Sequence, residues 1–249
     1  MDHSRVILTG GSGLLGSAFK KTLPDITYPS SEEFNVLRYD QMEEYVQAHG
    51  FEQLVHAAAF TSPPLIDKDP MTAVDVNIVG TANIVKLCAK FGARLLYICT
   101  DYVFKGDKGN YKEDDPVLPV NKYAWSKLGG ECAVRMYDKS LVIRTTFGPD
   151  VFPYEKAFID QWTSRESVSV IAWKISKLID EDILGVIHVG GERKTVFEYA
   201  KNLDESRDIG ELSVNDVNFD VPFDTSLKCD KYNALTGGEC STEDIQCEF

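Results

Sequence analysis

Short apolar runs alternate with longer amphipathic stretches along the first part of the chain. The runs with the length and composition of buried strands are residues 5–9, 25–28, 53–56, 94–99 and 140–144. The stretches between them repeat apolar positions at helical spacing, over residues 14–23, 39–48, 70–91 and 121–137. Strands that alternate with helices in this way predict a parallel, doubly wound sheet, which is a Rossmann-type α/β fold.

Prolines and capping residues predict several element boundaries. Pro70 is expected at the first position of a helix and Gly92 directly after its end, where these residue types are favoured. Two prolines within residues 61–69 predict a loop there. Further along we expect a helix over Val168–Ile179, a strand over Gly185–Val189, a helix that opens with a capping box of Thr195 and Glu198, and a loosely ordered end over the last twelve or so residues.

A glycine-rich turn joins the first predicted strand to the first helix. Gly10, Gly13 and Gly16 have G-x-x-G-x-x-G spacing, and the strand–turn–helix context distinguishes this motif from an ordinary glycine-rich loop. The glycines allow a tight turn and close backbone approach, and the helix N-terminus offers N–H groups to phosphates. The turn therefore predicts a dinucleotide site. No acidic residue directly follows residues 25–28, which leaves both NADP and NAD open.

The carboxyl ends of the strands are where a doubly wound sheet binds its ligands. Gly10, Ala57, Thr100 and Arg144 all lie at such ends, so we expect them to converge on one cleft. Ala57–Ala59 are small enough for a flat cofactor to lie against the backbone.

Three further side chains have structural interpretations. Strand alternation should turn Cys99 away from the cleft on which Thr100 lies. His56 is interpreted as a packed strand histidine rather than a catalyst. Asn77 is a polar residue inside the long predicted helix, and we expect its amide to brace the neighbouring strand ends.

Tyr123 and Lys127 are candidates for proton transfer. They lie four residues apart in a predicted helix, and side chains at this spacing share one helix face. A nearby ammonium lowers the pKa of a phenol, which would suit Tyr123 for passing a proton to or from a substrate oxygen. Taken alone, the pair fits a solvated helix face equally well, so its interpretation depends on the surrounding motifs.

Composition argues against several classes of partner. Asp and Glu (39) outnumber Lys and Arg (26), which gives a net charge of −13 and argues against nucleic-acid binding and against an anionic membrane surface. No apolar run approaches the roughly 20 residues of a membrane helix, and the N-terminus lacks the apolar core of a signal peptide. We therefore expect a cytoplasmic protein. The six cysteines show no C-x-x-C pair, so reduced thiols and no metal site are expected.

With these motifs in place, the chain resembles the extended short-chain dehydrogenases/reductases, and within them the dTDP-4-dehydrorhamnose reductase group of sugar-nucleotide 4-ketoreductases. The segments that carry the resemblance are Thr9–Gly16, His56–Thr61, Asn77, Thr100–Gly106, Tyr111, Glu113, Pro119, Tyr123–Lys127 and Arg144–Thr145. The Thr-Asp-Tyr-Val-Phe run at residues 100–104 is the most specific. The similarity is good over residues 5–147 and patchy beyond, where Pro222–Leu227 also matches the family.

The resemblance implies hydride transfer from NADPH or NADH to C4 of a nucleotide-linked 4-keto-6-deoxy sugar. Thr100 would hydrogen-bond the keto oxygen, Tyr123 would donate the proton, and Lys127 would hold the nicotinamide ribose. The implied cofactor-binding residues are Gly10, Ser12, Gly13, Leu14, Leu15, Gly16, Asn35, Val36, Ala57, Ala58, Ala59, Asn77, Cys99, Tyr123 and Lys127. The implied substrate-binding residues are Thr61, Thr100, Asp101, Tyr102, Tyr123 and Phe147. A homodimer is one option for the assembly.

The resemblance also sets the expected domains. Residues 1–147 would form the dinucleotide-binding domain, with helix 167–179 packed back on it, and residues 148–249 a small, shortened substrate-binding part with a C-terminal tail. The family usually carries a longer insertion before an Asp-Gln turn, whereas here Asp160 and Gln161 follow Pro153 almost at once. The sugar and the nucleotide therefore stay open. Arg165 and Lys174 could contact a diphosphate, although a solvated position is the expectation for both.

Two other functions stay open. The regulatory subunit of methionine adenosyltransferase resembles the same family and works through a partner, and the shortened C-terminal part favours such a binding role. An epimerase or dehydratase with tightly held NAD is the other, because Asp101 occupies the position where a dehydratase has an acid, although no glutamate follows it. The intact set of Thr100, Tyr123 and Lys127 favours the reductase, since a pure binding module has no chemical need for all three.

Overall fold

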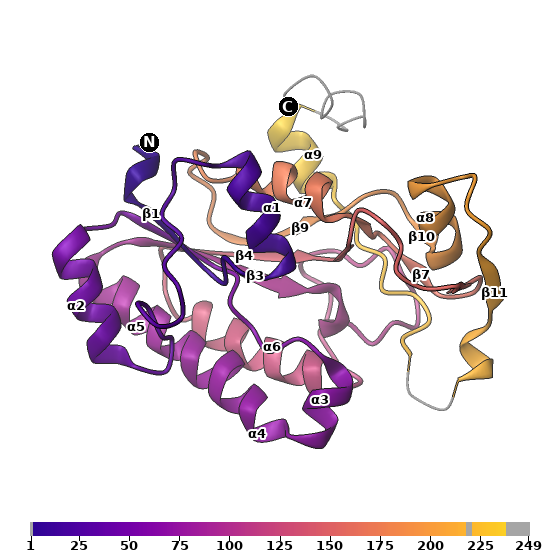
Figure 1. Ribbon diagram of the computed structural model, residues 1–249, viewed down its shortest axis with the longest axis horizontal. Coiled ribbons are helices and arrows are strands. Elements are labelled where there is room, and N and C mark those ends of the chain that lie inside the picture. The colour runs from indigo at the N-terminus through magenta and orange to yellow at the C-terminus, as the bar shows by residue number, and fades with distance from the viewer. Residues whose placement is uncertain (1, 218–220, 238–249) are drawn as a thin grey trace. The chain divides into compact units, whose positions relative to one another are not determined.

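The computed structural model describes residues 2–217 and 221–237. Its five-stranded sheet has the order β1 (Val6–Thr9), β2 (Gln53–His56), β3 (Arg94–Thr100), β4 (Ser140–Thr145) and β9 (Gly185–Val189). β1 pairs in parallel with β2, and β2 with β3. Figure 1 shows α1 (Leu14–Thr22) on one face of the sheet and α5 (Thr81–Phe91) and α6 (Lys122–Val134) on the other. The predicted doubly wound α/β fold is confirmed.

The predicted helix over residues 70–91 is a continuous run of three pieces. It consists of α4 (Pro70–Ala73), a π-helical turn (Val74–Gly80) and α5. The Asp69 side chain accepts a hydrogen bond from the backbone N–H of Thr72, and Gly92 adopts a left-handed φ of 71°. The predicted boundaries at Pro70 and Gly92 are therefore confirmed.

Other elements of the described chain follow in sequence order. The helices are α2 (Tyr39–His49), α3 (Pro63–Lys68), α7 (Val168–Ser176), α8 (Val196–Leu203) and α9 (Asp230–Thr236), with 3₁₀ turns at His3–Arg5, Asp101–Val103 and Val214–Asp216. The short strands are β5 (Phe147–Gly148), β6 (Lys156–Phe158), β7 (Trp162–Thr163), β8 (Glu166–Ser167), β10 (Lys194–Thr195) and β11 (Gly210–Leu212). The capping box of Thr195 and Glu198 is confirmed at the start of α8.

Two predicted elements differ in the structure. Residues 25–28 form only an isolated bridge, in which Thr27 exchanges backbone hydrogen bonds with Val6 and Leu8 at 2.8 Å, because Pro29 follows at once and cannot donate to a strand ladder. The predicted loop over residues 61–69 contains α3, which starts at Pro63, since a proline is well tolerated in the first turn of a helix. The expected loose end falls on residues 238–249, which lie outside the described residues.

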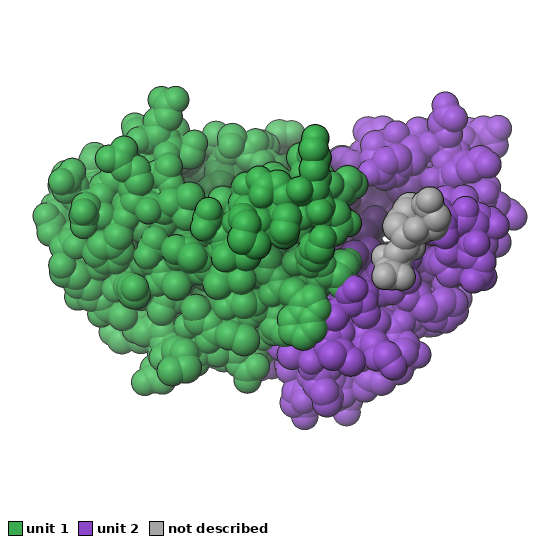
Figure 2. Space-filling view, turned by 90° about the horizontal axis from the view of Figure 1, so that it is seen from below, with its two compact units in different colours: residues 1–99, 121–143, 180–186 green, residues 100–120, 144–179, 187–249 purple. Residues whose placement is uncertain are grey.

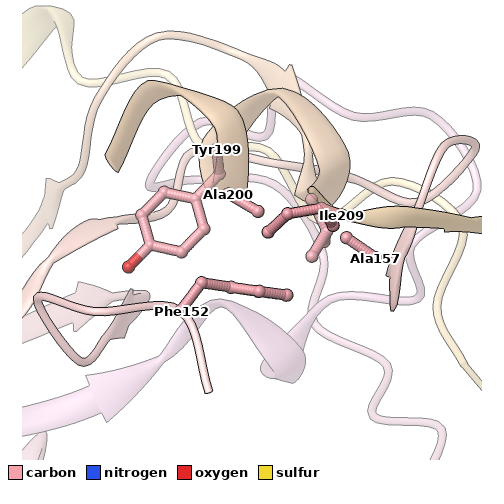
Figure 3. Packing of buried hydrophobic residues seen from close by; sticks show 6 residues of the cluster. Phe152, Ala157, Tyr199, Ala200 and Ile209 are labelled. Atoms are coloured by element: carbon pink, nitrogen blue, oxygen red, sulfur yellow. The ribbon is translucent and has the colours of Figure 1, made fainter. Parts of the chain in front are cut away.

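The chain divides into two compact units, coloured separately in Figure 2. Unit 1 comprises Met1–Cys99, Asn121–Ile143 and Asp180–Val186, and unit 2 comprises Thr100–Val120, Arg144–Ile179 and Ile187–Phe249. Unit 2 has an apolar cluster around α8, shown in Figure 3. There the rings of Phe152 and Tyr199 meet edge to face with centroids 6.3 Å apart, and Ala157, Ala200 and Ile209 pack beside them.

Candidate functional site

The glycine turn of unit 1 is closely packed against the backbone. A Cβ on Gly10 would lie 2.7 Å from the amide nitrogen of Ala58, and Gly10 has a φ of +83°. A Cβ on Gly16 would lie 2.2 Å from the Gly10 carbonyl oxygen. Both positions therefore exclude any side chain. Gly13 is the N-cap of α1, and no side chain caps this helix terminus within the described residues, which fits the phosphates of a dinucleotide.

A buried chain of hydrogen bonds links this strand end to the π-helical turn. Thr9 Oγ1 lies 2.8 Å from His56 Nδ1, and His56 Nε2 lies 3.0 Å from Thr81 Oγ1. Thr81 Oγ1 donates to the Asn77 carbonyl at 2.7 Å, so the imidazole donates from Nε2 and accepts at Nδ1. Burial lowers the pKa of His56 to about 3. The interpretation of His56 as a packed, neutral strand histidine is confirmed.

Asn77 connects three segments through its side chain. Its amide oxygen accepts from Phe60 N at 2.7 Å, and its amide nitrogen donates to Phe60 O and to Ser126 Oγ, both at 2.8 Å. The expected bracing of the segment after β2 is therefore confirmed. The contact with Ser126 adds a link to α6 that we did not predict.

Tyr123 and Lys127 lie on α6, whose first turn is capped by Asn121. Lys127 is buried, and its Nζ lies 4.4 Å from the centroid of the Tyr97 ring. The Tyr97 hydroxyl donates to the Lys127 carbonyl at 3.0 Å. Burial lowers the pKa of Lys127 to about 8, against the opposing charges of Cys99 and Glu131.

The helix geometry makes this pair suitable for acid–base chemistry. Tyr123 is half-buried, whereas Lys127 is 3% exposed. The structure thus places a buried lysine and a half-buried tyrosine one helical turn apart. Cys99 is buried with its Sγ 4.0 Å from the Lys127 carbonyl oxygen.

Unit 2 holds the residues that follow β3. Thr100 Oγ1 accepts from Tyr102 N at 3.2 Å and donates to Asp101 Oδ1 at 3.1 Å. The other carboxylate oxygen of Asp101 accepts from Thr225 Oγ1 at 2.6 Å. Burial raises the pKa of Asp101 to about 6, although its hydrogen bonds and the charge of Arg165 oppose the shift.

Other candidate residues have separate positions. Val36 is buried against the π-helical turn, where a Cβ on Gly80 would approach within 2.7 Å of Val36 Cγ2. Asn35 caps its own turn by accepting from Leu37 N at 2.9 Å. Thr61 is exposed just before α3, and Phe147 lies in β5 of unit 2. Thr100 belongs to unit 2 and Tyr123 and Lys127 to unit 1, so their meeting stays a prediction.

Three residues near the candidate groups were missed in the sequence. Ser126 donates to the Tyr123 carbonyl at 2.7 Å, and the signals for it were its place directly before Lys127 and within the segment Tyr123–Lys127 that resembles the family. Gln161 Nε2 donates to the Tyr102 hydroxyl at 3.3 Å. Thr225 belongs to the segment Pro222–Leu227, whose likeness to the family could have drawn attention to it.

The expectation of a solvated position is wrong for Lys174. The residue is 6% exposed, and its Nζ donates to the Gly190 carbonyl at 2.8 Å. Arg165 is half-buried, and its charge acts on Asp101 and Tyr102.

Comparison with known proteins decides the family. Residues 4–218 match the family described as RmlD substrate binding domain. The chain belongs to this family. The resemblance to the dTDP-4-dehydrorhamnose reductase group, drawn from the motifs, is thereby confirmed.

The similar proteins are of two kinds, a methionine adenosyltransferase subunit and dTDP-4-dehydrorhamnose reductases. Methionine adenosyltransferase 2 subunit beta of Bos taurus is 28% identical over 237 residues, which cover 80% of this chain and 70% of that protein. The dTDP-4-dehydrorhamnose reductase of Aggregatibacter actinomycetemcomitans is 28% identical over 208 residues, with 80% and 71% covered. The crystal structure of the dTDP-4-dehydrorhamnose reductase of Bacillus anthracis in complex with NADP is 26% identical, with a TM-score of 0.85 over 99% of this chain and 97% of that one.

Among residues 2–217 and 221–237, no helix combines the length and the apolar character needed to cross a membrane.

Proposed function

We propose that this protein is an NADPH-dependent oxidoreductase of the dTDP-4-dehydrorhamnose reductase type, which reduces a nucleotide-linked 4-keto-6-deoxy sugar. The observation that carries the proposal is the pair Tyr123 and Lys127 on a helix whose first turn is held by Asn77 through Ser126. The uncapped glycine turn in the same unit supports a dinucleotide coenzyme. The likeness to a reductase solved with NADP supports the same assignment.

In this proposal residues 1–147 bind the coenzyme and residues 148–249 contribute most of the substrate contacts. The bound coenzyme supplies the hydride, and NADP or NAD would lie on Gly10, Gly13 and Gly16. We favour NADP over NAD because the similar dTDP-4-dehydrorhamnose reductase of Bacillus anthracis was solved in complex with NADP.

The chain's own groups place and protonate the keto sugar. Tyr123 donates a proton to the keto oxygen, Thr100 hydrogen-bonds that oxygen, and the Lys127 ammonium stabilises the phenolate left behind. Asp101, Tyr102 and Phe147 would contact the sugar or its nucleotide. A positioned proton donor contributes ~10²–10⁴-fold in rate, and alignment of the reactants ~7–11 kcal/mol of barrier.

The test is consumption of NADPH, followed by its absorbance, in the presence of a dTDP- or UDP-linked 4-keto-6-deoxyhexose. We expect turnover that is lost in Tyr123→Phe and in Lys127→Met, whereas Tyr154→Phe, which alters an exposed tyrosine of unit 2, keeps it. Absence of turnover on every keto sugar by a protein that binds NADPH would contradict the proposal.

A second candidate is a coenzyme-binding regulatory subunit. The similarity to methionine adenosyltransferase 2 subunit beta, over 80% of this chain, favours it. A regulatory subunit would bind NADPH without consuming it and would change the kinetics of a methionine adenosyltransferase catalytic subunit. Mixing the two proteins and measuring the KM of that enzyme for methionine distinguishes the candidates.

A further inference from the structure

Unit 2 contains an open cavity of about 620 Å³ between α7, the turn after β9 and the start of α9. Its lining includes Lys174, Gly190, Asn110, Leu227, Cys229 and Asn233. Among the described residues that line it, only Lys174 was named above as a residue that could contact a diphosphate, and the residues implied to bind the coenzyme or the sugar are not part of the lining. Its size is within the range of small-molecule sites.

Lys174 is the buried charge of this cavity. The residue is 6% exposed, and the bond to the Gly190 carbonyl is the only hydrogen bond that its ammonium makes within the described chain, while the Lys174 carbonyl accepts from the Tyr232 hydroxyl at 2.9 Å. The Tyr232 ring lies 6.0 Å from the ammonium. No carboxylate of the described residues lies within 4.0 Å of it, so the charge is buried without a counter-ion, which is unfavourable.

The other cations of the lining all have carboxylate partners. Arg193 binds Asp224 through Nε and Nη2, both at 2.8 Å. Lys194 Nζ lies 2.5 Å from Glu166 Oε1, and Lys228 Nζ lies 3.0 Å from Asp230 Oδ2. The unmatched positive charge is therefore that of Lys174. Exposed Glu192 also lines the cavity. Its carboxylate would repel a ligand that carries several negative charges.

Glycine and asparagine residues also belong to the lining of the cavity. Gly190 and Gly191 are closely packed, since a Cβ on Gly191 would require the Glu166 carboxylate to move and one on Gly190 would lie 3.0 Å from Ser164. Asn110 and Asn233 also line the cavity. Asn110 has a left-handed φ of 46°, and no other non-glycine residue of the described chain has a positive φ. Its N–H donates a 2.7 Å hydrogen bond to Ser226 Oγ.

We propose that this cavity is a binding site for a small molecule that carries a carboxylate or phosphate group, with that anionic group at Lys174 Nζ and the amide groups around the rest of the ligand. The anionic group of the ligand would be the counter-ion of the Lys174 ammonium. This site is independent of the proposed reductase activity, because its residues all belong to unit 2 and lie outside the coenzyme and proton-transfer residues.

The test is calorimetric titration of the full-length protein with inorganic phosphate and with citrate, in the presence of saturating NADP. Lys174→Gln removes the charge and keeps a donor for Gly190, and Lys177→Gln is the matched control, because Lys177 is exposed on the same part of the chain and does not line the cavity. We expect at least one of the two anions to bind the wild type and Lys177→Gln alike, and to bind Lys174→Gln about 10-fold more weakly or worse. Binding of phosphate alone would indicate a site for a phosphate group, and binding of citrate alone a site for a carboxylate.

A second measurement uses the wild-type protein alone and so does not depend on the folding of a variant. Crystals soaked in selenate should show anomalous density within hydrogen-bond distance of Lys174 Nζ. Equal affinity in all three proteins, no binding of either anion by the wild type, or selenate density only elsewhere in the protein would each overturn the proposal.

Discussion

The amide nitrogen of Asn77 lies 2.8 Å from the hydroxyl oxygen of Ser126. Ser126 in turn donates to the Tyr123 carbonyl at 2.7 Å, so the π-helical turn and the first turn of α6 are held in one register. A π-helical turn is an unusual element that tends to occur at functional sites. We infer that this contact positions the tyrosine and lysine of the proposed reaction.

Replacing Ser126 by Ala removes both hydrogen bonds. We expect a loss of about 1–3 kcal/mol in the free energy of unfolding, because the Asn77 amide loses a buried partner, and a fall in kcat of ~10–10²-fold from misplacement of Tyr123. The matched control is Ser140→Ala, which removes a buried 2.9 Å hydrogen bond to Val134 O near the other end of α6. The control should lose stability and keep kcat. Equal effects of the two variants on kcat would contradict the positioning role.

Lys127 is a buried cation whose charge costs stability. Its pKa is about 8 in the folded protein, against 10.5 for the free side chain, so the folded state binds fewer protons than the unfolded state between these values. We expect Lys127→Met to raise the free energy of unfolding at pH 7 by about 3 kcal/mol, and this gain to shrink as pH rises from 8 to 10.5.

The measurement is urea unfolding of the coenzyme-free protein across this pH range. Lys122→Met, on the exposed side of the same helix, is the control and should change stability by no more than about 0.5 kcal/mol. A Lys127→Met protein that is less stable than the wild type at pH 7 would show that the lysine is a structural residue.

Asp101 is a buried carboxylate whose charge, like that of Lys127, lowers the stability of the folded protein. Burial raises its pKa to about 6 from 3.8, so the folded state binds more protons than the unfolded state between these values, and stability is lost as pH rises through this window. We expect Asp101→Asn to be about 3 kcal/mol more stable than the wild type at pH 7, with the difference disappearing below pH 4. Thermal unfolding at both pH values checks this, with exposed Asp114→Asn as the control. A difference that does not depend on pH would refute it.

Two buried histidines make the fold sensitive to acid. Burial lowers the pKa values of His56 and His188 to about 3, so between pH 7 and pH 5 the unfolded chain takes up protons that the folded chain does not. Each histidine should therefore lower the free energy of unfolding by about 2 kcal/mol over this interval. Nuclear magnetic resonance of the ring Cε1 protons gives the two pKa values directly. A midpoint above pH 5 for either ring would disprove the expectation.

The sheet and the glycine turn could be predicted because their signals are local. Gly10, Gly13 and Gly16 follow a strand at fixed spacing, and the caps at Pro70 and Gly92 depend on neighbours a few residues away. The short strands of unit 2 have two or three residues each, and β7 pairs with β10 about thirty residues further along the chain. Such pairs depend on contacts that no local pattern encodes.

The candidate site was predictable only in its local parts. The four-residue spacing of Tyr123 and Lys127 was visible, whereas the contact of Asp101 with Thr225 joins residues 124 positions apart. The burial of Lys174 likewise results from Gly190 and Tyr232, which come from distant segments. The apolar residues around Lys174 in α7 indicate a buried helix, but no local pattern identifies the groups that its ammonium contacts.

The most direct test of the proposed ketoreductase activity follows deuterium from the coenzyme to the sugar. NADPH deuterated at the nicotinamide C4 is incubated with the protein and dTDP-4-dehydrorhamnose, and the sugar product is analysed by mass spectrometry. We expect one deuterium at C4 of the sugar with the wild type, and a rate ~10²–10⁴-fold lower with Tyr123→Phe, which still binds NADPH. A sugar that stays unlabelled with the wild type, or an equal rate of labelling with Tyr123→Phe, would contradict it.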